Sequence, residues 1–73
     1  MNRFFIVSEI QQDANGNIAV LTTPKTDWNE ALSTYYSICA AAAISAIPYH
    51  AANIVGDDGV LKMSQVFDRR AED

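Results

Sequence analysis

The hydrophobic and polar positions near the start of the chain alternate as they do in strands. The segment "RFFIVSEIQ", residues 3–11, is rich in aromatic and β-branched residues and too short for a typical globular helix. A period of two divides it into one face with Phe4, Ile6 and Ile10 and a second face with Phe5, Val7 and Glu9. Because apolar residues occur on both faces, the pattern favours a central strand. The segment "NIAVLT", residues 17–22, is the expected returning strand.

The residues between these two strands predict a hairpin. They read "DANGN", and Asn15-Gly16 is a strong turn signal, because Gly16 can take a positive φ without Cβ strain. Either a two-residue turn at Asn15-Gly16 or a type I turn with a bulge at Gly16 fits the spacing.

A single helix is predicted over residues 28–47. Pro24 breaks the preceding strand pattern, since proline donates no hydrogen bond and restrains the residue before it. Asp27 is a candidate N-cap, with Glu30 three residues later as in a capping box. Pro48 marks the other end.

The periodicity of this helix separates two faces. The face expected to pack on the sheet holds Trp28, Leu32, Tyr35, Cys39, Ala42 and Ala46, widened by Ala31, Ile38 and Ala43. The opposite face holds Glu30, Ser33, Thr34, Ser37, Ala40, Ala41, Ile44 and Ser45. A solvated helix face usually carries Glu and Lys, yet between Glu30 and Asp57 the chain has no charged residue.

The second half of the chain predicts another hairpin. The expected strands are "YHAANIV" (49–55) and "VLKMSQVF" (60–67), with "GDDG" as the turn and Leu61, Met63 and Phe67 on one face. The remainder, "DRRAED" (68–73), is a polar tail. The fold class is therefore α+β in the order ββαββ: one domain, residues 1–73, in which a four-stranded antiparallel sheet is covered on one face by the helix. The strand order stays open.

Composition points toward self-association. The chain has 73 residues, 49% of them hydrophobic, and a core this small often needs a disulfide, a metal or a partner subunit. A single cysteine excludes an internal disulfide and favours the reducing cytoplasm, while one histidine and one cysteine argue against a structural zinc site. No cofactor is expected, so a partner subunit is the remaining source of additional stability.

Charge and hydropathy exclude two further classes of partner. The net charge is −4 and lysines and arginines do not cluster, so no nucleic-acid partner is expected. Residues 31–49 are uncharged, but their serines and threonine argue against a membrane segment. The N-terminus lacks a small-residue cleavage pattern, which argues against a signal peptide.

The charge-free helix face is the predicted oligomer interface. Small side chains would let a second backbone approach closely, and the predicted interface residues are Ser33, Ser37, Ala40, Ala41 and Ile44. The plain alternative is that alanine is a good helix former and this face is solvated. We therefore expect a non-catalytic, self-associating interaction module. The rival is a small-ligand-binding dimer with a pocket between helix and sheet near Tyr35 and Tyr36.

Other candidate chemistry is weak. Cys39 and His50 could form a thiol–imidazole pair, but the position of Cys39 on the core face favours a buried apolar role, and no catalytic residue is predicted. Asp13, Asn15 and Asn17 resemble the start of an EF-hand loop. However, Ile18 stands where the loop glycine belongs and Pro24 where the bidentate glutamate belongs, so calcium is rejected. Asp57-Asp58 is typical of a turn.

The segments "SEIQQDANGNIAVL", "NEALSTYY", "AAAAISAIPYHAANIV" and "GDDG" resemble small uncharacterised proteins of gut-type Firmicutes and their prophages. These proteins have no assigned activity, so the resemblance implies no site residue. It implies a phage or prophage structural or accessory role, with other structural proteins as partners, in the cytoplasm or in a virion-like particle.

Overall fold

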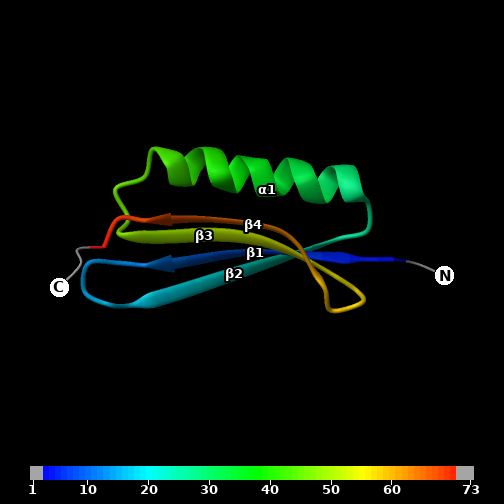
Figure 1. The fold of residues 1–73 in the computed structure, drawn as a ribbon, viewed down its shortest axis with the longest axis horizontal. Coiled ribbons are helices and arrows are strands. Elements are labelled where there is room, and N and C mark those ends of the chain that lie inside the picture. Colours follow the sequence, from blue (N-terminus) through cyan, green and yellow to red (C-terminus); the bar gives the residue numbers. More distant parts are fainter. Residues whose placement is uncertain (1–2, 71–73) are drawn as a thin grey trace.

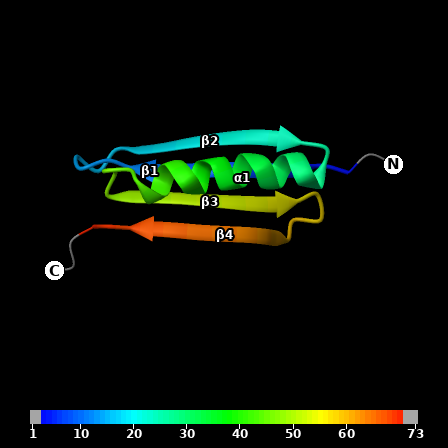
Figure 2. The ribbon, with the colours of Figure 1, turned by 90° about the horizontal axis from the view of Figure 1, so that it is seen from above.

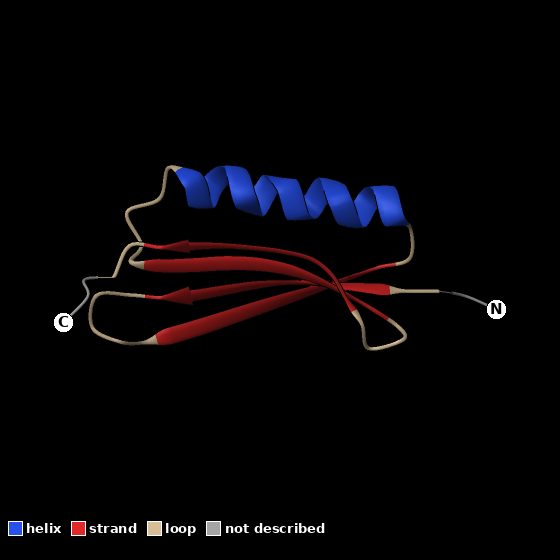
Figure 3. Ribbon diagram, in the orientation of Figure 1, coloured by secondary structure: helices blue, strands red, loops and turns tan. Residues whose placement is uncertain are grey.

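The computed structural model describes residues 3–70, which form one sheet with one helix packed on it (Figure 1). The elements are β1 (Phe5–Gln12), β2 (Ile18–Lys25), α1 (Trp28–Ala43), β3 (Tyr49–Gly56) and β4 (Leu61–Asp68). This ββαββ order confirms the predicted fold class. Figure 3 shows the helix above the strands, and within the described residues no helix or strand lies against the lower face of the sheet.

The strand order, which the sequence left open, is β2-β1-β3-β4. β1 pairs antiparallel with both β2 and β3, and β3 pairs antiparallel with β4. Because β1 lies between them, β2 and β3 run parallel to each other, and α1 carries the chain from one side of β1 to the other. Figure 2 shows α1 lying along β1 and β3, with β2 and β4 as the two edges.

The core lies between α1 and the two central strands. Val7 and Ile54 are cross-strand neighbours in the register of β1 and β3, and both are fully buried. Ala31 and Tyr35 of the helix are buried against them. The partly buried residues around this core are Phe5, Trp28, Leu32, Ile38, Cys39 and Met63. The predicted core face of the helix is thus confirmed over most of its length.

The two ends of the helix differ in how well they were predicted. At the start, Asp27 is the N-cap, and its Oδ2 accepts a hydrogen bond from the backbone N–H of Glu30 at 3.1 Å. At the other end, α1 stops at Ala43, before the predicted Ile47. Arg69, which follows β4, donates to the carbonyl oxygens of Ala42 at 2.8 Å and Ala43 at 3.0 Å. These carbonyls belong to the last turn, and Ala42 O also accepts from Ser45 N at 3.2 Å. Arg69 therefore adds a second bond to Ala42 O and supplies a donor to Ala43 O, one of the carbonyls that a helix end leaves without an intrahelical partner.

Pro24 does not end its strand, contrary to the prediction. β2 continues through Pro24 to Lys25, with Pro24 opposite Ile6. β2 is an edge strand, and an edge strand has backbone groups without a strand partner, so a missing N–H is tolerated there.

Leu61 lies on the opposite face from the one predicted. The register between β3 and β4 shifts at Ile54/Val55, so that Ile54 pairs with Met63 and Val55 with Leu61. This bulge adds one residue to β4 and reverses the alternation at its start. Met63 therefore faces the helix with Ile54, whereas Leu61 faces away from it with Val55.

Both predicted turns are present and alike. Gly16 N donates to Asp13 O at 3.0 Å and Gly16 has φ +86°, which matches the type I turn with a bulge at Gly16. In the second hairpin, Gly59 N donates to Gly56 O at 2.9 Å and Gly59 has φ +77°. Of the predicted polar tail, Asp68 ends β4, and residues 71–73 lie outside the described residues.

Candidate interaction surface

The face of the sheet opposite α1, which we call the open sheet face, is built from every second residue of each strand. Strand alternation places it on the side away from Val7 and Ile54. The strand register arranges its residues in four transverse rows. The first apolar row is Pro24, Ile6, Val55 and Leu61; the polar row is Thr22, Ser8, Asn53 and Ser64; the second apolar row is Val20, Ile10, Ala51 and Val66; the end row is Ile18, Gln12, Tyr49 and Asp68.

Large apolar side chains on this face are exposed. The exposed fractions are 67% for Ile18, 61% for Val20, 55% for Leu61 and 48% for Val66. At the row positions of the described strands, Asp68 is the only charged residue. Contiguous apolar surface of this kind typically marks a site where another molecule binds.

The polar row crosses the middle of the apolar surface. Its four side chains are short, uncharged and able to both donate and accept hydrogen bonds. Ser64 donates from its hydroxyl to Asn53 Oδ1 at 2.8 Å, so two neighbours in this row already contact each other. The row therefore interrupts the apolar surface without adding charge.

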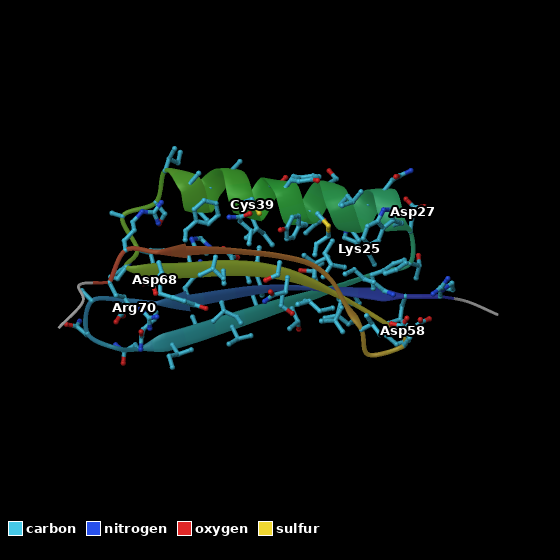
Figure 4. The ribbon with its side chains drawn as sticks, viewed as in Figure 1. Lys25, Asp27, Cys39, Asp58, Asp68 and Arg70 are labelled. Carbon is cyan, nitrogen blue, oxygen red and sulfur yellow. The ribbon has the colours of Figure 1, made fainter. Side chains whose placement is uncertain are left out.

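A hollow of about 130 Å³ lies at the end row, lined by Ile10, Gln12, Ile18, Tyr49 and Arg70. The Arg70 guanidinium lies 4.5 Å from the centre of the Tyr49 ring, in cation–π geometry. It also donates to both carboxylate oxygens of Asp68, at 2.9 and 2.8 Å. These bonds lower the pKa of Asp68 to about 2. Figure 4 shows Asp68 and Arg70 together at this end of the molecule.

The predicted interface on the helix is also exposed. Ser33, Ser37, Ala40, Ala41 and Ile44 all face away from the sheet, and Ile44 is 89% exposed. This surface consists mainly of serine and alanine, so it offers much less apolar area than the open sheet face. That these residues form an interface stays a prediction.

The two tyrosines predicted to line a pocket lie in different environments. Tyr35 is buried in the core, whereas Tyr36 is 55% exposed, and their rings meet edge to face at 5.3 Å. Burial, with Cys39 beside it, raises the pKa of Tyr35 to about 12. Hollows of about 400, 300 and 130 Å³ are lined by other residues, at the β1–β2 turn, beside Glu9 and at the end row.

Cys39 and His50 have separate surroundings. Cys39 packs against the core with Tyr35 and faces the sheet in Figure 4. His50 is 2% exposed, and its Nε2 lies 2.5 Å from Glu9 Oε2, which also accepts from Gln11 Nε2 at 2.9 Å. His50 Nδ1 has no hydrogen-bond partner among the described residues.

The Glu9–His50 pair was not predicted from the sequence. His50 lies opposite Gln11 in the register of β1 and β3, and Glu9 is on the same face two residues away, so the two side chains meet only once these strands pair. The partner of the buried His50 ring is therefore the Glu9 side chain. Within residues 3–70, no three His, Cys, Asp or Glu side chains gather so as to hold a metal ion.

The Asp13 carboxylate serves the first turn. Its Oδ1 accepts from the backbone N–H groups of Asn15 and Asn17, each at 2.9 Å, and Oδ2 accepts from Asn17 Nδ2 at 3.2 Å. The bond from the Asn17 backbone is the main cause of a lowered Asp13 pKa. These contacts account for the EF-hand-like spacing as turn chemistry.

Comparisons with protein-family models, with curated proteins and with solved structures give no match for this chain. No helix among the described residues combines the length and the apolar character needed to cross a membrane. The fold and its surface define the molecule as a two-layer α+β domain with one covered and one open sheet face.

Proposed function

We propose that this chain is a small non-catalytic interaction module that self-associates through its open sheet face. The observation that carries the proposal is the exposure of Ile18, Val20, Leu61 and Val66 on a surface with almost no charge. A sheet usually buries both faces or keeps the second face polar. Here the second face is mainly apolar, so a partner is the element that would cover it.

The size of the face suits a dimer. Each strand has eight residues, which at about 3.3 Å per residue gives a length of about 26 Å. Four strands about 4.8 Å apart are about 19 Å wide, so the flat footprint is about 500 Å². Two copies would together bury on the order of 1,000 Å², the area at which specific interfaces begin.

The small core supports the same proposal. Among the described residues, the largest side chains that are fully buried are only Ile54 and Val7. Domains of this size gain stability from association, because burying further apolar surface offsets the entropy lost on folding.

The resemblance to prophage-encoded proteins supports a structural or accessory role for the assembly. In that role the module would work in the cytoplasm or in a virion-like particle, with other structural proteins as further partners.

The test compares lysine substitutions on the two exposed faces. Val20→Lys with Val66→Lys places two charges on the open sheet face, while Ser37→Lys with Ala41→Lys places two on the helix. Desolvating charges in an interface is costly, so the sheet variant should be monomeric and the helix variant should keep the wild-type mass by multi-angle light scattering. Dissociation of the helix variant alone would move the interface to α1, and a monomeric wild type would overturn the proposal.

A further inference from the structure

We infer that two copies of this chain pack open sheet face to open sheet face, with a two-fold axis along the polar row and Phe4 of each copy seated in the other's end-row hollow. The inference rests on the proposed function and adds to it the partner, a second copy of this chain, and the register.

The two apolar rows are complementary under this symmetry. A two-fold axis along the polar row keeps each strand over the same strand of the second copy and exchanges the rows on either side of the axis. The facing pairs are Ile6 with Ile10, Val55 with Ala51, Leu61 with Val66 and Pro24 with Val20. Each of these positions is apolar, although Ala51 is only 2% exposed and so contributes little contact surface.

The polar row meets itself on the axis. Ser8 faces Ser8 of the second copy, and likewise Asn53, Ser64 and Thr22 each face their own counterpart. Hydroxyl and amide groups donate and accept, so identical side chains can satisfy each other. Any shift of the register along the strands by one row would instead place this polar row on an apolar row.

Phe4 and the end-row hollow are related by the same axis. Phe4 precedes Ser8 by four residues and Gln12 follows it by four, which is about 13 Å in either direction along β1. Phe4 is 45% exposed and lies directly before β1. Its carbonyl accepts from Asp57 N, which continues the pairing of β1 with β3 by one residue, so the alternation carried back from Ile6 places Phe4 on the open sheet face. The hollow of about 130 Å³ is close in size to cavities of about 150 Å³ that hold a benzene ring.

Phe4 is held in place for this contact. Its backbone N–H donates to Asp57 Oδ2 at 3.3 Å, and its carbonyl accepts from Asp57 N at 3.1 Å. The symmetry also carries Asp57, four residues after Asn53, to Tyr49, four residues before Asn53. The Asp57 carboxylate of one copy, which lies 3.8 Å from the Arg3 guanidinium of its own chain, therefore approaches the Arg70 guanidinium over Tyr49 of the other. This contact would join two ion pairs, because Arg70 already binds Asp68.

A two-fold axis parallel to the strands fits less well. It would also place the polar row on itself, but β2 would lie over β4 of the second copy. Ile18, which is 67% exposed, would then face the Asp68 carboxylate. That arrangement would also leave Phe4 outside the hollow.

Single cysteines test the register, in a Cys39→Ala background treated with a short thiol-specific crosslinker. Ser8→Cys and Thr22→Cys should each give a covalent dimer, because these positions face themselves across the axis. Val20→Cys is the matched control on β2 and should give none, because its two copies would lie about 13 Å apart along the strand.

Any other pattern of crosslinking among these three variants would contradict the register. An axis parallel to the strands would separate the two Thr22 positions, and pairing of β2 edges would crosslink Thr22→Cys but leave Ser8→Cys unlinked. If the wild type is dimeric but the expected crosslinks do not form, only the register is wrong. If the wild type is monomeric, both the proposed function and the register are wrong.

Phe4→Ala gives a second readout that does not depend on crosslinking. Removing the ring from the hollow should weaken dimerisation at least ten-fold in sedimentation equilibrium. Tyr36→Ala, which removes a similarly exposed aromatic ring from α1, should leave dimerisation unchanged. Equal dissociation constants for wild type and Phe4→Ala would overturn the placement of Phe4 in the hollow.

Discussion

Gly16 shows how a single residue sets a turn. Its φ of +86° lies in the left-handed region, while an added Cβ would meet no atom within 4 Å. The cost of a side chain there is therefore conformational and not steric. Gly16→Val should lower the free energy of unfolding by about 1–3 kcal/mol, measured by urea denaturation.

Gly16→Asn is the control for this effect. Asparagine adopts the left-handed region more readily than other residues with a Cβ, so its loss of stability should be much smaller. Equal losses for the two variants would contradict the conformational explanation.

Tyr35 makes stability depend on alkaline pH. Burial, with Cys39 beside it, raises its pKa from 10.0 to about 12, so the folded state favours the neutral phenol. This contribution is fully present below pH 10 and is lost as the pH rises to 12. The shift corresponds to about 3 kcal/mol. Stability should therefore fall more steeply from pH 10 to 12 in wild type than in Tyr35→Phe, measured by denaturant unfolding at each pH. Identical slopes would show that Tyr35 does not ionise on unfolding.

At the scale of elements, one side chain from outside the helix binds the C-terminal end of α1. Arg69 donates to the carbonyls of Ala42 and Ala43, and its guanidinium lies 5.7 Å from the centre of the Phe67 ring. Arg69→Ala should lower stability by about 1 kcal/mol and speed amide hydrogen exchange in the last helical turn. Unchanged exchange in that turn would mean that the helix ends there without Arg69.

A second prediction at this scale concerns the outer face of α1, which is either solvated or an interface. Lysine is nearly as good a helix former as alanine, so Ser37→Lys with Ala41→Lys should shift the melting temperature very little on a solvated helix. A large fall in melting temperature together with a smaller mass would restore the helix as the interface.

At the scale of the whole molecule, folding and association should be linked. If the open sheet face is buried by a second copy, tenfold dilution removes about 1.4 kcal/mol of stability per dimer. The melting temperature of wild type should then fall by roughly 3–5 °C per tenfold dilution, measured by calorimetry. The Val20→Lys with Val66→Lys variant should melt at a lower temperature that does not depend on concentration. A wild-type melting temperature independent of concentration would contradict association through this face.

The amino-acid sequence by itself determined the features that depend on neighbouring residues. Asp27 as N-cap, the positive φ at Gly16 and the core face of α1 around Tyr35 all follow from local spacing, since a cap, a turn and a helix period each span only a few residues. The alternation in β1 likewise assigned Ile6 and Val7 to opposite faces.

Only the tertiary structure decided what those faces meet. The strand order, the bulge that turns Leu61 away from the helix and the pairing of Glu9 with His50 depend on residues distant in sequence. The same holds for the open sheet face, whose rows exist only once four strands are in register. The alternation of a strand shows which residues share a face, but it does not show which of the two faces the single helix covers. Which residues remain uncovered is therefore decided by the packing of α1 against Val7 and Ile54, and not by any local pattern.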